Sequence, residues 1–85
     1  MKEARLNLKN EDGLHARAAA LFVRRANQYA SDITVIVEDN EINGKSIIGL
    51  MSLGIYSGQE VTLQADGNDE EEALKDLKKL VEEEL

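Results

Sequence analysis

Apolar and polar residues alternate at the start of the chain, and the period changes soon afterwards. Ala4, Leu6 and Leu8 alternate with polar residues, which predicts a strand with one buried face. The polar segment 11–13 interrupts this pattern. From Ala16 onward, apolar residues recur at the spacing of an amphipathic helix, which we expect to end at residues 31–32.

Three further strands and a short apolar segment follow. Alternation over residues 33–37 predicts a second strand, and Asp39-Asn40 suits a tight turn, so residues 41–43 should return as a short third strand. Residues 47–53 form a short apolar segment that ends at Gly54. Alternation resumes over residues 61–65 and predicts a fourth strand.

One apolar stripe predicts a helix near the end of the chain, formed by Ala73, Leu74, Leu77, Leu80 and Val81. Either Asn68 with Glu71 or Asp69 with Glu72 matches a capping box at its start. The three glutamates at 82–84 oppose the helix dipole, so we expect this end to fray.

The predicted order is β-α-β-β-α-β-α in a single domain, residues 1–85. Strands with one apolar face fit an α+β fold in which helices cover one side of an antiparallel sheet. The other side, with Asn7, Thr34 and Gln64, should be open to water.

Charge and composition exclude some classes of function. The net charge is −7, and the whole acidic excess lies in residues 51–85, so nucleic acid is a poor partner. No apolar run is long enough to span a bilayer, and the first residues lack the apolar block of an export signal, so we expect a cytoplasmic protein. With no cysteine and one histidine, we expect neither a metal site nor a cofactor.

The only histidine stands directly before the first predicted helix, in the segment GLHARAAALF at 13–22. The first N–H groups of a helix have no internal partner and attract anions, so the amides of Ala16, Arg17 and Ala18 would suit a phosphoryl group on His15. Gly13 allows the chain to turn there, and the Arg17 guanidinium is a good phosphate donor. The alternative is an ordinary surface histidine.

A second candidate site begins at NGKS, residues 43–46. It is not a nucleotide-binding loop, because Asp39 stands where that loop needs glycine. Ser46 is in position to cap the short helix that follows, and a phosphate there would also be stabilised. Such a phosphate would place negative charge beside an expected apolar docking patch, made of Ile47, Ile48, Leu50 and Met51.

GLHARAAALF and NGKSIIGLMSLG together resemble HPr, the histidine-containing phosphocarrier family of the bacterial phosphoenolpyruvate:sugar phosphotransferase system. The resemblance implies an open-faced β-sandwich of four antiparallel strands and three helices. It implies that His15 accepts a phosphoryl group on Nδ1 from Enzyme I, that Arg17 stabilises it, and that IIA domains of sugar permeases receive it. Arg24 and the apolar docking patch would contact these partners, and a monomer is expected.

The resemblance also bears on Ser46 and on Ala18. In HPr proteins of Gram-positive type, HPr kinase/phosphorylase modifies the serine that matches Ser46, which hinders docking to Enzyme I and creates a co-repressor of the catabolite control protein. The family usually has proline where this chain has Ala18, so we expect one extra amide near the phosphoryl group.

Two further readings stay open beside the phosphocarrier. One is an HPr-like paralogue with a mainly regulatory role, either in the nitrogen-related branch or as a co-regulator of catabolite repression. The other, a hydrolase built from Ser46 and His15, lacks a recognisable nucleophile elbow.

Overall fold

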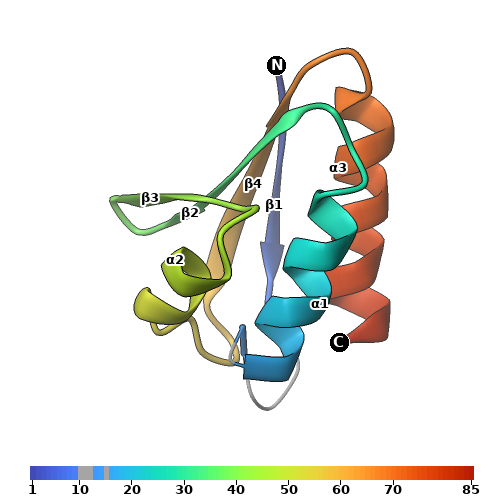
Figure 1. The fold of residues 1–85 in the computed structure, drawn as a ribbon. Helices are drawn as coiled ribbons and strands as arrows, with labels where there is room; N and C mark the ends of the chain where they lie inside the picture. Colours follow the sequence, from blue (N-terminus) through green and yellow to red (C-terminus); the bar gives the residue numbers. More distant parts are fainter. Residues whose placement is uncertain (10–12, 15) are drawn as a thin grey trace.

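The chain forms a four-stranded antiparallel sheet with its helices on one face (Figure 1). The structure is a computed structural model that describes residues 1–9, 13–14 and 16–85. Its strands, in the sheet order β1-β4-β2-β3, are β1 (Lys2–Asn7), β2 (Asp32–Val37), β3 (Asn40–Asn43) and β4 (Glu60–Asp66). Its helices are α1 (Ala16–Ala26), α2 (Ile47–Ser52) and α3 (Glu70–Lys79), followed by a π-helical turn, η1 (Leu80–Glu84). The predicted α+β open-faced sandwich is confirmed.

The core lies between the sheet and the helices because the strands alternate. Their inward residues, such as Leu6, Val35 and Leu63, are buried against Phe22 of α1 and Leu77 of α3. The outward residues of the same strands are exposed or half-buried, as expected for the open face of the sheet.

Helix α1 is shorter than its apolar spacing predicts. It ends at Ala26, and the amides of Gln28 and Tyr29 bond back to the third residue before them, which tightens the last turn. The next two amides, of Ala30 and Ser31, donate to the Asp69 carboxylate of another element at 2.8 and 2.9 Å. These bonds draw the chain away from the helix axis.

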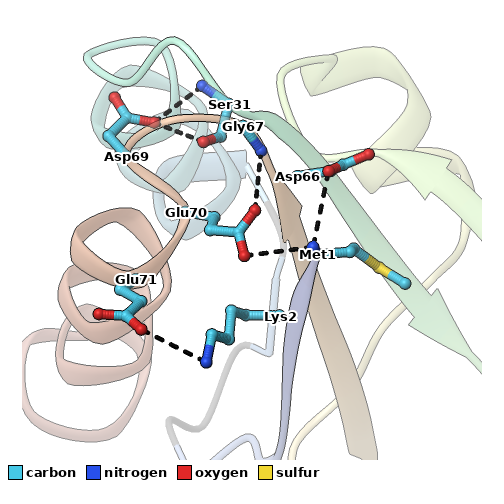
Figure 2. Close-up of polar contacts among 8 residues, drawn as sticks. All are labelled: Met1, Lys2, Ser31, Asp66, Gly67, Asp69, Glu70 and Glu71. Carbon is cyan, nitrogen blue, oxygen red and sulfur yellow. Dashed lines mark hydrogen bonds and ion pairs between the residues drawn. The ribbon is translucent and has the colours of Figure 1, made fainter.

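The predicted capping box of α3 is wrong. Asp69 is the N-cap residue, but its carboxylate makes no cap bond and instead accepts from the Ser31 backbone N–H and hydroxyl (Figure 2). Glu70 accepts from the Gly67 N–H at 3.1 Å, one residue earlier than the first predicted pair and two residues earlier than the second. Asp69 therefore ties the start of α3 to the end of α1.

The end of the chain does not fray as predicted. Residues 80–84 continue α3 as η1, in which Leu80 and Val81 are buried. Arg25 of α1 donates to Asp76 at 2.7 Å and to Glu84 at 3.2 Å, and Tyr29 donates to the same Asp76. Burial, followed by the bond to Asp76, raises the pKa of Tyr29 to about 12.

The hairpin between β2 and β3 turns one residue earlier than predicted. Val37 pairs with Asn40, so the two-residue loop is Glu38-Asp39 and β3 begins at Asn40. Glu38 adopts a φ of 57°, which tight hairpin loops of this length require.

Candidate functional site

Residues 13 and 14 are seated against the segment that leads into β4. The Leu14 N–H donates to the Ile55 carbonyl at 3.1 Å, and the Leu14 side chain is buried. Gly13 has a φ of +60°, and a Cβ on it would lie 2.3 Å from the Ile55 oxygen and 2.7 Å from the Tyr56 Cα. Only glycine fits there, so this contact fixes the chain immediately before the single histidine.

The first turn of α1 follows directly. His15 lies outside the described residues, while Leu14 and Ala16 on either side of it are described. The helix begins at Ala16, whose φ of 22° is rare for a residue with a side chain. The amides of Ala16, Arg17 and Ala18 belong to the first turn, where backbone N–H groups lack helical acceptors. Arg17 is exposed, as its predicted role requires, whereas the Ala18 side chain is buried.

The arginines further along α1 differ from one another. Arg24 is exposed, as expected for a residue that contacts a partner. Arg25 is held by Asp76 and Glu84, whose hydrogen bonds raise the pKa of its guanidinium. Arg25 therefore joins α1 to α3 and is not part of a free basic patch.

Ser46 caps α2. Its Oγ accepts from the Gly49 N–H at 3.1 Å, and its backbone is extended, with φ −111° and ψ 110°. The residue is half-buried, and the Lys45 Nζ beside it donates to the Tyr29 carbonyl at 2.8 Å. The expected cap is confirmed, and the hydroxyl stands at the amide end of α2, although a six-residue helix supplies little dipole.

The apolar residues of α2 fall on two faces. Ile48 is 80% exposed, Met51 40% and Ile47 38%, whereas Leu50 is fully buried. We call Ile47, Ile48 and Met51 the α2 patch. The prediction of Leu50 as a docking residue is wrong, because the Leu50 side chain lies on the inner face of α2 and packs in the core.

Two more exposed apolar residues were not predicted as docking residues. Tyr56, 62% exposed, belongs to the segment that seats Gly13, and Leu21 of α1 is 37% exposed. In Figure 1 the start of α1, helix α2 and the connection into β4 lie at the same end of the molecule. No local pattern marks Tyr56, since it follows a helix stop in an irregular segment.

Two features are absent from the described residues. In that part of the chain, no group of three or more histidine, cysteine, aspartate or glutamate side chains is arranged to hold a metal ion. Within the same residues, no helix is both long and apolar enough to cross a bilayer.

Comparison with known proteins places this geometry in a family. The family model PTS-HPr, described as the PTS HPr component phosphorylation site, matches residues 2–83. The HPr-like protein Crh of Bacillus subtilis is 46% identical over 85 residues, which is the whole of both chains. Phosphocarrier protein HPr of Neisseria meningitidis serogroup A is 41% identical over 81 residues, 95% of this chain and 91% of that protein.

Solved structures agree with the fold. HPr-C-His from Thermoanaerobacter tengcongensis is 51% identical and covers 96% of this chain and 92% of its own, with a TM-score of 0.94. HPr of the same organism has also been solved as a dimer, at 50% identity, 99% and 97% coverage and a TM-score of 0.78. Crh of Bacillus subtilis has been solved as a swapped, intertwined dimer, at 46% identity, 100% and 98% coverage and a TM-score of 0.79. With one family model matching nearly its full length and relatives above 40% identity, the chain belongs to the PTS-HPr family.

Proposed function

We propose that this protein is a phosphocarrier of the phosphoenolpyruvate-dependent phosphotransferase system. His15 accepts a phosphoryl group on Nδ1 from phospho-Enzyme I and passes it to a IIA domain of a sugar permease. The observation that supports this most directly is the contact that Gly13 and Leu14 make with the backbone of Ile55 and Tyr56. It fixes the residue before the histidine while α1 starts immediately after it.

The neighbours of His15 suit a group that is held briefly. In the forward transfer, the Nδ1–P bond forms as the bond from phosphorus to the donor on Enzyme I breaks, and the reverse exchange occurs at the IIA domain. The exposed Arg17 and the amides of the first turn of α1 would hold the phosphoryl oxygens. Each 1.4 kcal/mol of excess stabilisation would bias the exchange about tenfold against delivery, so few donors and an exposed site suit a carrier. This chemistry requires only one copy of the chain, in line with the expected monomer. The proposed location is the cytoplasm, as also expected from the sequence.

The α2 patch and Arg24 would form the surface that meets both partners. Exposed apolar side chains on α2 and an exposed cation on α1 combine apolar contact with attraction to an acidic partner. Phosphorylation of Ser46 by HPr kinase/phosphorylase would place negative charge beside Ile47 and Ile48, because Ser46 directly precedes them at the cap.

A mainly regulatory role, as in Crh, is the second candidate. It is favoured by the full-length identity to Crh, which is described as a catabolite repression HPr. The phosphorylated Ser46 form would then bind the catabolite control protein, and His15 would be idle. The presence of both His15 and Arg17 favours the carrier.

One assay distinguishes the two roles. The protein is incubated with phosphoenolpyruvate and Enzyme I, and we expect acid-labile, base-stable phosphate on the native chain and none on His15→Ala. A native chain that stays unlabelled would exclude the carrier. A parallel incubation with ATP and HPr kinase should give acid-stable phosphate that Ser46→Ala abolishes.

Two arginine variants test the assigned roles separately. Arg17→Ala should slow transfer at saturating Enzyme I, whereas Arg24→Ala should mainly raise the KM for this protein. Lys79→Ala, which removes an exposed cation from α3, is the control and should change neither parameter. Equal effects of all three variants would show that only net charge matters.

A further inference from the structure

We propose that strand β1 pairs with β1 of a second copy of this chain, antiparallel and centred on Ala4, so that the two sheets become one. The starting observation is that β1 is an edge strand whose only neighbour in the sheet, among the described residues, is β4. An open edge presents unpaired backbone groups that another strand can bind.

The register shows which residues of β1 present these groups. The Ile33 carbonyl accepts from the Gly44 N–H on the β3 side, so Thr34 directs its backbone groups toward β4. Thr34 pairs with Gln64, so Gln64 faces β2 and its neighbour Leu63 faces β1.

The alternation then carries over to β1 itself. Leu63 pairs with Ala4, so Ala4 bonds to β4 while Glu3 and Arg5 direct their N–H and C=O groups to the open edge. The end of the strand agrees with this assignment. Leu8, four residues beyond Ala4, donates to the Gln59 carbonyl at 3.1 Å and accepts from the Gly58 N–H at 2.6 Å.

The side chains at this edge match their own two-fold copy. In an antiparallel pair centred on Ala4, Glu3 of one chain lies opposite Arg5 of the other, and the same pair recurs across the axis. Both side chains are exposed on the open face of the sheet. Glu3 accepts from the Gln64 amide at 3.0 Å, whereas Arg5 has no hydrogen bond or ion pair to any of the described residues.

The helix side of the same edge presents apolar surface beside β1. A groove of about 300 Å³ lies between β1 and α3, with an apolar floor and a charged rim; it is lined by Lys2, Ala4, Glu71, Leu74, Lys75 and Lys78. Figure 1 shows α3 running in the same direction as β1, and the Lys2–Glu71 pair at 3.3 Å sets their alignment (Figure 2).

The two-fold axis that relates the two β1 strands therefore also relates the two grooves. Two residues of a strand rise about as far as four residues of a helix, so Ala4 lies level with Leu74 and Lys75. A two-fold axis at Ala4 then covers both Leu74 side chains and brings Glu71 of one copy toward Lys78 of the other, although it also places the two Lys75 side chains near each other. The Glu3–Arg5 complementarity on the open face, together with the apolar surface at Leu74, identifies the occupant as a second copy of the chain.

The relatives are consistent with self-association at some surface. HPr of Thermoanaerobacter tengcongensis and Crh of Bacillus subtilis have both been solved as dimers, and Crh exchanges part of its fold. The pairing proposed here differs, since β1 keeps its own β4 as partner. The start of α1 and the α2 patch remain free, because the interface uses only β1 and α3.

Sedimentation equilibrium from micromolar to millimolar concentration tests the proposal. We expect a native mass that rises toward that of a dimer. Arg5→Glu, which places like charges opposite each other twice, should weaken association about tenfold. The double variant Glu3→Arg/Arg5→Glu restores both pairs and should associate within about threefold of the native chain. A native chain that is monomeric at millimolar concentration, or a double variant as weak as Arg5→Glu, would overturn the proposal.

A cross-link tests the geometry. Residues directly opposite at a non-hydrogen-bonded site are about 4.5 Å apart at Cα, within disulfide range, and this chain contains no cysteine. Ala4→Cys should therefore oxidise readily to a covalent dimer that Arg5→Glu suppresses, while the exposed control Ser57→Cys should not. Mixed labelled and unlabelled native chains should exchange freely. Exchange only as fast as global unfolding would show that β1 is swapped, which contradicts the proposed pairing.

Discussion

At the scale of single residues, two glycines with nearly equal backbone angles have different roles. Gly13 and Gly54 have φ values of +60° and +63°. A Cβ on Gly54 would meet nothing within 4 Å, whereas one on Gly13 would clash with the backbone of Ile55 and Tyr56. Gly54 is needed only for its angle, while Gly13 is needed for its angle and for close approach.

Gly13→Ala should therefore destabilise the protein more than Gly54→Ala does. Both variants carry a backbone cost of about 1 kcal/mol, and the clash at residue 13 should add about 1–3 kcal/mol. Urea unfolding measures the difference. Gly13→Ala should also slow labelling of His15 by Enzyme I, because the chain before the histidine must move. Equal stabilities of the two variants would show that residues 13 and 55 are not in contact.

Ala18 permits a test at the level of one N–H group. Replacement by proline removes an amide from the first turn of α1, where no helical acceptor awaits it. If that amide binds the phosphoryl group, Ala18→Pro should shift the transfer equilibrium toward phospho-Enzyme I by a factor of about three to ten. Ala18→Gly keeps the N–H and should leave the equilibrium unchanged. An unchanged equilibrium in Ala18→Pro would exclude this role.

At the scale of elements, local pattern predicts where helices and strands lie better than where they end. The apolar spacing of α1 continues to Ala30, yet the helix stops at Ala26 because Asp69 takes the amides of Ala30 and Ser31. The same carboxylate makes no cap hydrogen bond at the start of α3, where one was predicted. Contacts between residues 38 or more positions apart decide both outcomes, and no local window contains them.

The cap of α2 is local, and it was predicted correctly. Ser46→Ala removes the acceptor of the Gly49 N–H and should lower the free energy of unfolding by about 1 kcal/mol. Ser46→Asp keeps an acceptor and adds charge, so its stability should stay near native while its affinity for Enzyme I falls. Chemical denaturation and binding titrations separate the two effects. If Ser46→Ala weakens docking as much as Ser46→Asp, helix stability rather than charge controls docking.

At the scale of the whole molecule, the alternating strands and amphipathic helices were enough to predict the architecture. Inward residues of four strands and two long helices have one common surface to bury, which leaves few arrangements. The site was predicted less completely. Ser46 and the exposed α2 patch could be inferred from chain order, but the burial of Leu50, the pairing of Arg25 and the exposure of Tyr56 depend on packing between distant segments.

The dependence of stability on pH involves the whole charge distribution. Hydrogen bonds from the Ser31 hydroxyl and the Ala30 amide lower the pKa of Asp69 below its ordinary 3.8, and the Gly67 amide lowers the pKa of Glu70 below 4.5. A carboxyl whose pKa is lower in the folded state stabilises the fold above its ordinary pKa. This stabilisation is lost as the pH falls through the pKa that the carboxyl has in the folded state, since the unfolded chain binds protons first.

Net repulsion acts in the opposite direction. The charge of −7 at pH 7 disfavours the compact state, and this effect weakens as acids are protonated. We therefore expect the urea midpoint to rise from pH 8 to about pH 5 and to fall below about pH 4. Salt should raise it at pH 7 by screening.

Asp69→Asn separates these two effects. It should lower stability at pH 7, because a neutral amide accepts the Ser31 and Ala30 bonds less strongly, and it should flatten the acid limb. Glu83→Gln removes an equal charge from an exposed position and should leave the acid limb intact while slightly raising stability at pH 7. If Asp69→Asn costs as much at pH 3 as at pH 7, the acid limb does not arise from this carboxylate, and general repulsion among the remaining charges controls it.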